Sequence, residues 1–192
     1  MKRLKLSLTA LLLLLPTLLI SQSAGGVDPA SLLKPLADSW PTYSGDYTGR
    51  RYSTLKQIDR NTVRNLTLGW IGRVNPALGG GTIVGGEGPE EWAPGNVSVR
   101  GAVLMVDGIL YPTAPDHVWA IDARDGRQLW HYYWKTRGGT HIGNRGVGIW
   151  RNYLFFETPD NYLVSLDLKT GKSVGTLKSP ISISSTSPRW RR

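Results

Sequence analysis

The sequence predicts an all-β protein built from tandem four-stranded sheets, and three observations support this fold class. Glycine (23), proline (12), tryptophan (8) and tyrosine (8) are plentiful, a balance typical of short strands joined by tight turns. A hydrophobic content of 40% over 192 residues is enough for a folded core. The third observation is an internal repeat in the second half of the chain, and this repeat predicts the architecture.

The repeat consists of two stretches that align with each other. GILYPTAPDHVWAIDARDGRQLW (108–130) matches NYLFFETPDNYLVSLDLKTGKSVG (152–175). The Pro-Asp pair recurs after 44 residues, whereas Asp122 recurs as Asp167 after 45, so the second copy contains one inserted residue. A period near 45, with four short strands in each unit, is the size of one β-propeller blade.

The turn in each repeat has a physical explanation. Asp122 follows a buried strand, and its carboxylate can accept backbone N–H groups of the turn, while Gly126 suits a position with positive φ. Trp130 then returns to cover the blade. The second copy keeps Asp167 but has Gly175 where the tryptophan belongs, so its docking is expected to be weaker.

The elements expected before the repeat are short. Residues 27–39 predict a covering helix with Leu32, Leu33 and Leu36 on one face. The remaining expectations are a loop over a larger body (40–55), one helical turn capped by Asp59 or Asn61 (57–65), a strand that would complete the last blade of a closed ring (66–74), and a stretch rich in Gly and Pro without regular structure (75–96).

The first 24 residues predict an export signal. Three positive charges precede a nearly unbroken apolar run from Leu6 to Ile20, and small residues follow at 21–24. A membrane anchor is the alternative, but a run of about 15 residues containing Pro16 is short for a bilayer that needs ~20. We therefore expect residues 25–192 to be the mature protein, located in the periplasm without a stable membrane anchor.

Charge and residue usage exclude several classes of function. The net charge is +9, but the positive residues form no basic helix, which disfavours nucleic-acid binding. The absence of cysteine excludes disulfides and thiolate metal sites within the chain. The three histidines, His117, His131 and His141, have no metal-ligand spacing and are interpreted as structural. The three glutamates of the Gly-Pro loop, Glu87, Glu90 and Glu91, are interpreted as solvated side chains.

Three segments carry a family resemblance. AIDARDGRQLW (120–130) resembles the A-x-D-x-x-x-G-x-x-x-W tryptophan-docking motif of the pyrroloquinoline quinone (PQQ)-dependent alcohol dehydrogenases. WPTYSGDYTGRRYSTLKQIDRNTVRNLTLGW (40–70) resembles the opening of these proteins, and GGTHIGNRGVGIW (138–150) resembles their Asn-Arg-Gly segment. The likeness covers about 39–177 and implies a partial β-propeller, with about two to three four-stranded blades of an eight-bladed quinoprotein ring and short helices near the N-terminus.

The resemblance also implies a chemistry and a set of cofactor-binding residues. An alcohol transfers hydride to PQQ, aided by Ca²⁺ or a lanthanide, and electrons leave through a cytochrome-type acceptor. Arg145 matches the arginine that contacts the quinone oxygens, and Asn144 precedes it. Arg100 stands where many members have a glutamate, and could pair with a cofactor carboxylate. Thr186 or Ser185 matches a hydroxyl residue that contacts the cofactor.

Two departures limit what the chain alone is expected to do. Gly139 and Thr140 replace a cysteine pair found in many members. A ring of six to eight blades needs on the order of 270 to 360 residues, and the family's metal ligands and catalytic aspartate lie beyond this sequence. The expectation is a fragment that is inactive by itself, with no catalytic or metal-binding residue assigned; a non-catalytic PQQ-like propeller scaffold is the alternative.

Overall fold

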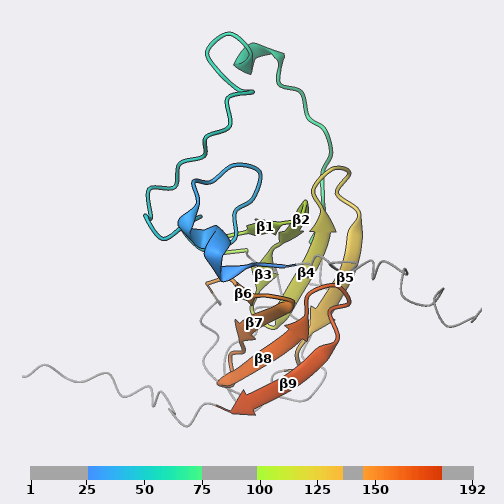
Figure 1. The fold of residues 1–192 in the computed structure, drawn as a ribbon. Helices are drawn as coiled ribbons and strands as arrows, with labels where there is room; N and C mark the ends of the chain where they lie inside the picture. Colours follow the sequence, from blue (N-terminus) through green and yellow to red (C-terminus); the bar gives the residue numbers. More distant parts are fainter. Residues whose placement is uncertain (1–25, 75–98, 136–144, 179–192) are drawn as a thin grey trace, which may run out of the picture.

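The computed structural model describes residues 26–74, 99–135 and 145–178 (Figure 1). Within these ranges the chain forms two antiparallel sheets and two short 3-10 helices. No helix in the same ranges is long and apolar enough to cross a membrane. The predicted leader (1–24) and the predicted irregular stretch (75–96) lie outside the described residues.

The first sheet has four strand positions. Its strands are β1 (Leu104–Val106), β2 (Ile109–Tyr111), β3 (Thr113–Ala114), β4 (His117–Asp122) and β5 (Gln128–Tyr133). Both β2 and β3 pair with β4, and the carbonyl of Pro112 between them accepts a hydrogen bond from the backbone N–H of Trp119 at 3.1 Å. They are thus two halves of one strand, interrupted where proline cannot donate.

The second sheet repeats the first. It contains β6 (Gly148–Trp150), β7 (Tyr153–Glu157), β8 (Tyr162–Asp167) and β9 (Ser173–Lys178), in the order β6-β7-β8-β9. The register shifts at Ser165/Leu166 in the second sheet and at Ala120/Ile121 in the first. Because even this irregularity recurs, the two copies repeat each other in structure as well as in sequence.

The inserted residue of the second copy falls in the Pro-Asp turn. The left-handed position of this turn is Asp116 (φ 64°) in the first sheet and Asn161 (φ 65°) in the second. The other turn matches its prediction: the Arg124 N–H donates to the Asp122 carboxylate at 3.0 Å, and Gly126 has φ 74°.

One hydrophobic core lies between the two sheets. Residues that are at most 4% exposed come from both of them: Val106, Tyr111, Val118 and Ala120 from the first, and Leu154, Phe156, Val164, Leu166 and Leu168 from the second. The sheets therefore pack face to face around one interface, as adjacent blades do, and not as two separate hairpins.

Tryptophan side chains pack on the turn of the repeat that follows them in the sequence. Trp130 on β5 donates its indole N–H to the carbonyl of Leu168 at 3.2 Å, and a Cβ on Gly171 would lie 2.6 Å from the indole Cδ2. Trp70 does the same one unit earlier, donating to the carbonyl of Ala123 at 3.0 Å. Trp130 thus packs on Tyr111 of its own sheet, as expected, and also covers the turn of the following sheet, a contact that the sequence did not predict.

The N-terminal segment crosses the edges of both sheets. Val27 forms a bridge with Arg151, and Trp40 forms one with Met105 of β1. The predicted helix over 27–39 is shorter, a 3-10 helix η2 (Pro29–Leu33) capped by the Asp28 side chain. Leu32 and Leu36 are buried as expected, but Leu33 is 78% exposed because this brief 3-10 turn does not continue the predicted α-helical face.

Two predictions for residues 57–74 have different outcomes. The turn is present: Asp59 accepts hydrogen bonds from the N–H groups of Asn61 and Thr62, and η3 (Val63–Asn65) follows. The strand predicted over 66–74 is wrong, since these residues form no ladder. Figure 1 shows this segment extending away from the sheets before it returns beside the β4–β5 end.

Replacing Trp130 tests the fastening between the sheets. We expect Trp130→Ala to lower the free energy of unfolding by about 3 kcal/mol, because an indole that packs against the core is removed. Trp130→Phe keeps an aromatic ring but loses the N–H donor and part of the indole surface, which together should cost about 2 kcal/mol. Urea unfolding at constant slope measures both changes.

The matched control is Trp150→Ala, whose side chain is 49% exposed. It should cost less than about 1 kcal/mol. Equal losses for Trp130→Ala and Trp150→Ala would contradict a special role for the inter-sheet indole.

Candidate functional site

The candidate site is formed where the first strands of the two sheets begin. Arg100 to Ala102 precede β1, and Arg145 to Val147 precede β6. The backbone N–H of Ala102 donates to the carbonyl of Arg145 at 3.3 Å. The fold therefore brings together two of the four residues predicted to bind a cofactor, although they are 45 positions apart in the sequence.

A close glycine contact underlies this juxtaposition. A Cβ on Gly101 would lie 2.5 Å from the backbone nitrogen of Gly146, and Gly146 itself has φ 119°, which side chains of L-residues resist. Two backbone segments can approach this closely only where neither carries a side chain.

Arg100 and Arg145 give this location a positive charge. Both side chains are exposed. Every ion pair among the described residues involves Arg124 or Arg127, so neither arginine of the site is neutralised by a described carboxylate. Two permanent cations on touching segments favour an anionic ligand, and guanidinium groups suit carboxylates or quinone oxygens through paired N–H donors.

The other predicted contacts are not placed. Asn144, Thr186 and the alternative Ser185 lie outside the described residues, as do His141, the three glutamates of the Gly-Pro loop and Gly139 with Thr140. The described ranges contain no group of three or more His, Cys, Asp or Glu side chains that could hold a metal ion.

A pair of histidines was missed by the sequence reasoning. His117 and His131, interpreted separately as structural, lie on the paired strands β4 and β5, with Nδ1 of His117 2.9 Å from Nε2 of His131. His117 also stacks on Trp119 and Tyr133 at centroid distances of 5.3 and 4.7 Å. Counting positions back from the hairpin turn would place His131 opposite Val118, on the other face; the register shift at Ala120/Ile121 instead sets it opposite Trp119, on the same face as His117.

Burial dominates the electrostatics of this pair. His117 is 2% exposed, and its Nε2 is buried and has no hydrogen-bond partner among the described residues. Burial, and after it the neighbouring His131, lowers the pKa of His117 to about 3. Burial also lowers the pKa of His131. The pair is therefore neutral at pH 7 and packs as part of an aromatic stack, consistent with a structural role.

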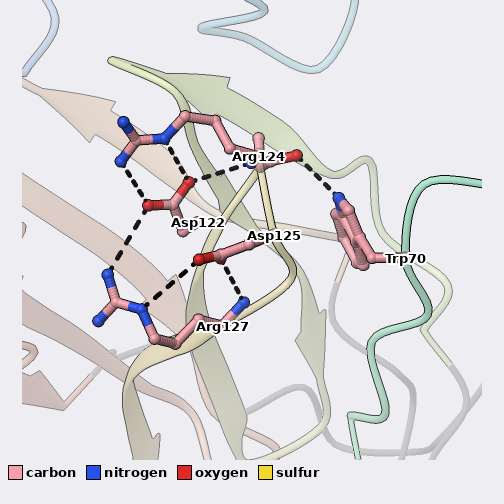
Figure 2. Close-up of polar contacts among 6 residues, drawn as sticks. Trp70, Asp122, Arg124, Asp125 and Arg127 are labelled. Carbon is pink, nitrogen blue, oxygen red and sulfur yellow. Dashed lines mark hydrogen bonds and ion pairs between the residues drawn. The ribbon is translucent and has the colours of Figure 1, made fainter.

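A second polar cluster belongs to the turn between β4 and β5. Figure 2 shows Arg124 and Arg127 on the Asp122 carboxylate, Asp125 beside Arg127, and Trp70 on the carbonyl that follows the strand. Hydrogen bonds from Arg124 hold the pKa of the Asp122 carboxyl well below its usual range. Since these charges neutralise one another, the cluster stabilises the turn on which Trp70 docks.

Comparison with known proteins bears on the arginine site. Residues 40–177 match the model of the PQQ family, described as the β-propeller domain of glucose/ethanol/alcohol dehydrogenases. The chain belongs to this family. The two sheets are accordingly two blades of a β-propeller, and the prediction of an all-β, partial propeller is confirmed.

Curated relatives of the PQQ family agree. The chain is 31% identical over 148 residues to the dehydrogenase subunit of the quinone alcohol dehydrogenase of Gluconacetobacter polyoxogenes, and 30% identical over 175 residues to quinohemoprotein alcohol dehydrogenase ADH IIB of Pseudomonas putida. These alignments cover 73% and 86% of this chain but 18% and 23% of the relatives. The chain thus spans about a fifth of the length of the proteins it matches.

Solved structures show the same fold. The quinohemoprotein alcohol dehydrogenase of Comamonas testosteroni superposes with a TM-score of 0.59 at 30% identity, covering 79% of this chain and 21% of that one. A europium-containing methanol dehydrogenase superposes with a TM-score of 0.53 at 21% identity, covering 78% of this chain and 24% of that one, which supports the fold alone.

The buried histidine predicts a pH dependence of stability. Its folded pKa of about 3 lies below the ordinary value of 6.5, so between these values the unfolded chain binds a proton that the folded chain excludes. Above pH 6.5, His117 is neutral in both states and does not change the free energy of unfolding. As the pH drops below 6.5, the free energy of unfolding falls by up to ~1.4 kcal/mol per pH unit.

His117→Phe removes this titration and keeps a ring in the stack. We expect the difference in unfolding free energy between wild type and variant to change steadily from pH 7 to pH 4.5 in favour of the variant. Urea unfolding at each pH measures it. Parallel curves for the two proteins would show that His117 does not titrate on unfolding.

Proposed function

We propose that this chain is part of a PQQ-dependent dehydrogenase that oxidises an alcohol by hydride transfer to the quinone. The observation that supports this most is the backbone contact between the segments that carry Arg100 and Arg145, at the start of the first strands of two adjacent blades. An exposed, unneutralised pair of guanidinium groups fits a planar quinone that carries carboxylates.

PQQ, when bound, supplies the carbonyl carbon that accepts hydride. Arg145 would hold the quinone oxygens with two N–H donors and stabilise the negative charge that develops there, since a guanidinium stays protonated throughout. Arg100 would bind a carboxylate of the cofactor. Asn144 and Thr186 are proposed as further contacts on the basis of the family motif.

The remaining parts of the proposal concern the whole protein. A Ca²⁺ or lanthanide ion would act as Lewis acid, and a cytochrome-type acceptor would take the electrons. The apolar run 6–20 after three positive charges supports export to the periplasm. We expect the 192-residue chain by itself not to turn over substrate, because the family's metal ligands and catalytic aspartate are not among its residues.

A non-catalytic propeller that serves as a binding scaffold is the second candidate. Two observations favour it: the chain contains no cysteine, and an arginine occupies position 100. Both change the surroundings expected of a catalytic cofactor in the family. The activity of the whole protein distinguishes the two candidates.

The test uses the whole protein loaded with PQQ and Ca²⁺. We expect alcohol-dependent dye reduction that falls about 10²- to 10³-fold in Arg145→Ala, because a charge-stabilising donor is lost. Arg145→Lys should lose less, since the positive charge remains. Lys172→Ala, an exposed cation in the β8–β9 turn, is the charge-matched control and should leave the rate unchanged. Equal rates in wild type and Arg145→Ala would defeat the enzymatic proposal.

A further inference from the structure

The first described residues lie across the same turn of both sheets. Residues 26–33, here called the strap, contact Asp107 in the β1–β2 turn and Arg151 in the β6–β7 turn, two equivalent positions with φ 53° and 52°. The backbone N–H of Gly26 donates to the Asp107 carboxylate at 3.1 Å. Val27 exchanges two backbone hydrogen bonds with Arg151, at 3.1 and 2.9 Å. The strap thus links two adjacent blades at one end.

Burial holds the strap in place. Val27 and Leu32 are 3% and 7% exposed, and both belong to the core that the two sheets share. Gly26 has φ 111°, and a Cβ on it would overlap the carbonyl oxygen of Arg151, so the position requires glycine. The packing of its neighbours therefore keeps the N–H of Gly26 beside the Asp107 carboxylate.

Asp107 offers an unneutralised negative charge at this place. The residue is exposed. All ion pairs in the described part of the chain involve Arg124 or Arg127, so no described cation pairs with the Asp107 carboxylate. A cation located next to Gly26 would therefore be attracted to Asp107.

Removal of the predicted leader would create such a cation. Hydrolysis of the Ala24–Gly25 bond by a peptidase consumes one water molecule and leaves a carboxylate on Ala24 and an α-ammonium group on Gly25. This group is largely protonated at pH 7, whereas the peptide nitrogen that it replaces is neutral. Residue 25 lies outside the described residues, but covalent geometry keeps its nitrogen within about 3.7 Å of the Gly26 nitrogen, and so within about 7 Å of the Asp107 oxygen.

We propose that Asp107 pairs with the α-ammonium group of Gly25 once the leader is removed, and that this ion pair stabilises the strap on both sheets. The inference rests on the proposed export, because an uncleaved chain has a neutral nitrogen at residue 25. Processing then strengthens the junction between two blades although no residue of either sheet is altered. The effect belongs to the end of the sheets away from the arginine segments, since Arg145 precedes β6 and Arg151 follows it.

The first experiment compares two forms of the whole protein that both begin at Gly25, one with a free α-amino group and one acetylated there. Hydrogen exchange of the Arg151 amide reports on the strap, because this amide donates to the carbonyl of Val27. Acetylation should speed its exchange about 2- to 5-fold, the range expected for an exposed ion pair. Exchange of the Trp119 amide on β4 should not change. Equal Arg151 rates in the two forms would overturn the proposal.

Variants of the carboxylate identify the partner of the amine. In Asp107→Asn, acetylation should have no effect, because the charge is gone while the amide oxygen can still accept from the N–H of Gly26. Asp38→Asn removes another exposed carboxylate of the N-terminal region and is the matched control, so the full effect of acetylation should remain. An effect that persists in Asp107→Asn would show that the amine pairs with a different group, and the proposal would fail.

The N-terminus of the exported protein tests the proposed export separately. Mass spectrometry of the periplasmic fraction should find a chain that begins at Gly25. A protein that keeps residues 1–24 would defeat the export, even where the two purified forms differ in exchange. A protein that begins at Gly25 but shows no effect of acetylation would defeat the ion pair and leave the export intact.

Discussion

An indole packed against a glycine joins the first sheet to the second, and the same contact docks the segment that precedes the first sheet. Trp130 reaches Gly171 and the carbonyl of Leu168, and Trp70 repeats the arrangement with Gly126 and the carbonyl of Ala123. The contact needs a glycine in the turn, an indole N–H within hydrogen-bond distance of a backbone carbonyl, and an apolar surface beneath the ring. A change in any of these would alter how the sheets stack. The same contact thus recurs at both sides of the first sheet, and a repeated junction of this kind is what a radial array requires.

The stacking of the sheets also determines where the charged groups meet. Once the two sheets share a core, the segments that lead into β1 and β6 must start at the same end, and they pass close enough for Gly101 to touch the backbone of Gly146. Arg100 and Arg145 are brought together by this packing and not by their places in the sequence. The positive character of the site is therefore a consequence of blade geometry, to which each segment contributes one residue.

Local features were predictable from the sequence, and contacts between distant segments were not. The Asp122 turn, the glycine at 126 and the four-strand repeat follow from short-range chemistry and period. The partner of Trp130 could not be read in this way, because it depends on how one sheet lies on another. The contact between His117 and His131 was not predictable either: the strand register decides it, and that register shifts by one residue at Ala120/Ile121.

Residues 66–74 show why a pattern alone does not make a strand. Their apolar alternation is present, and Trp70 and Val74 pack beside the buried Trp119 and Ile121, yet Leu68 and Ile71 are 75% and 74% exposed. A strand needs backbone partners as well as an apolar face, and the described residues offer none on this side. Since Trp70 performs here what Trp130 performs from the outer strand β5, the segment has the side-chain chemistry of an outer strand.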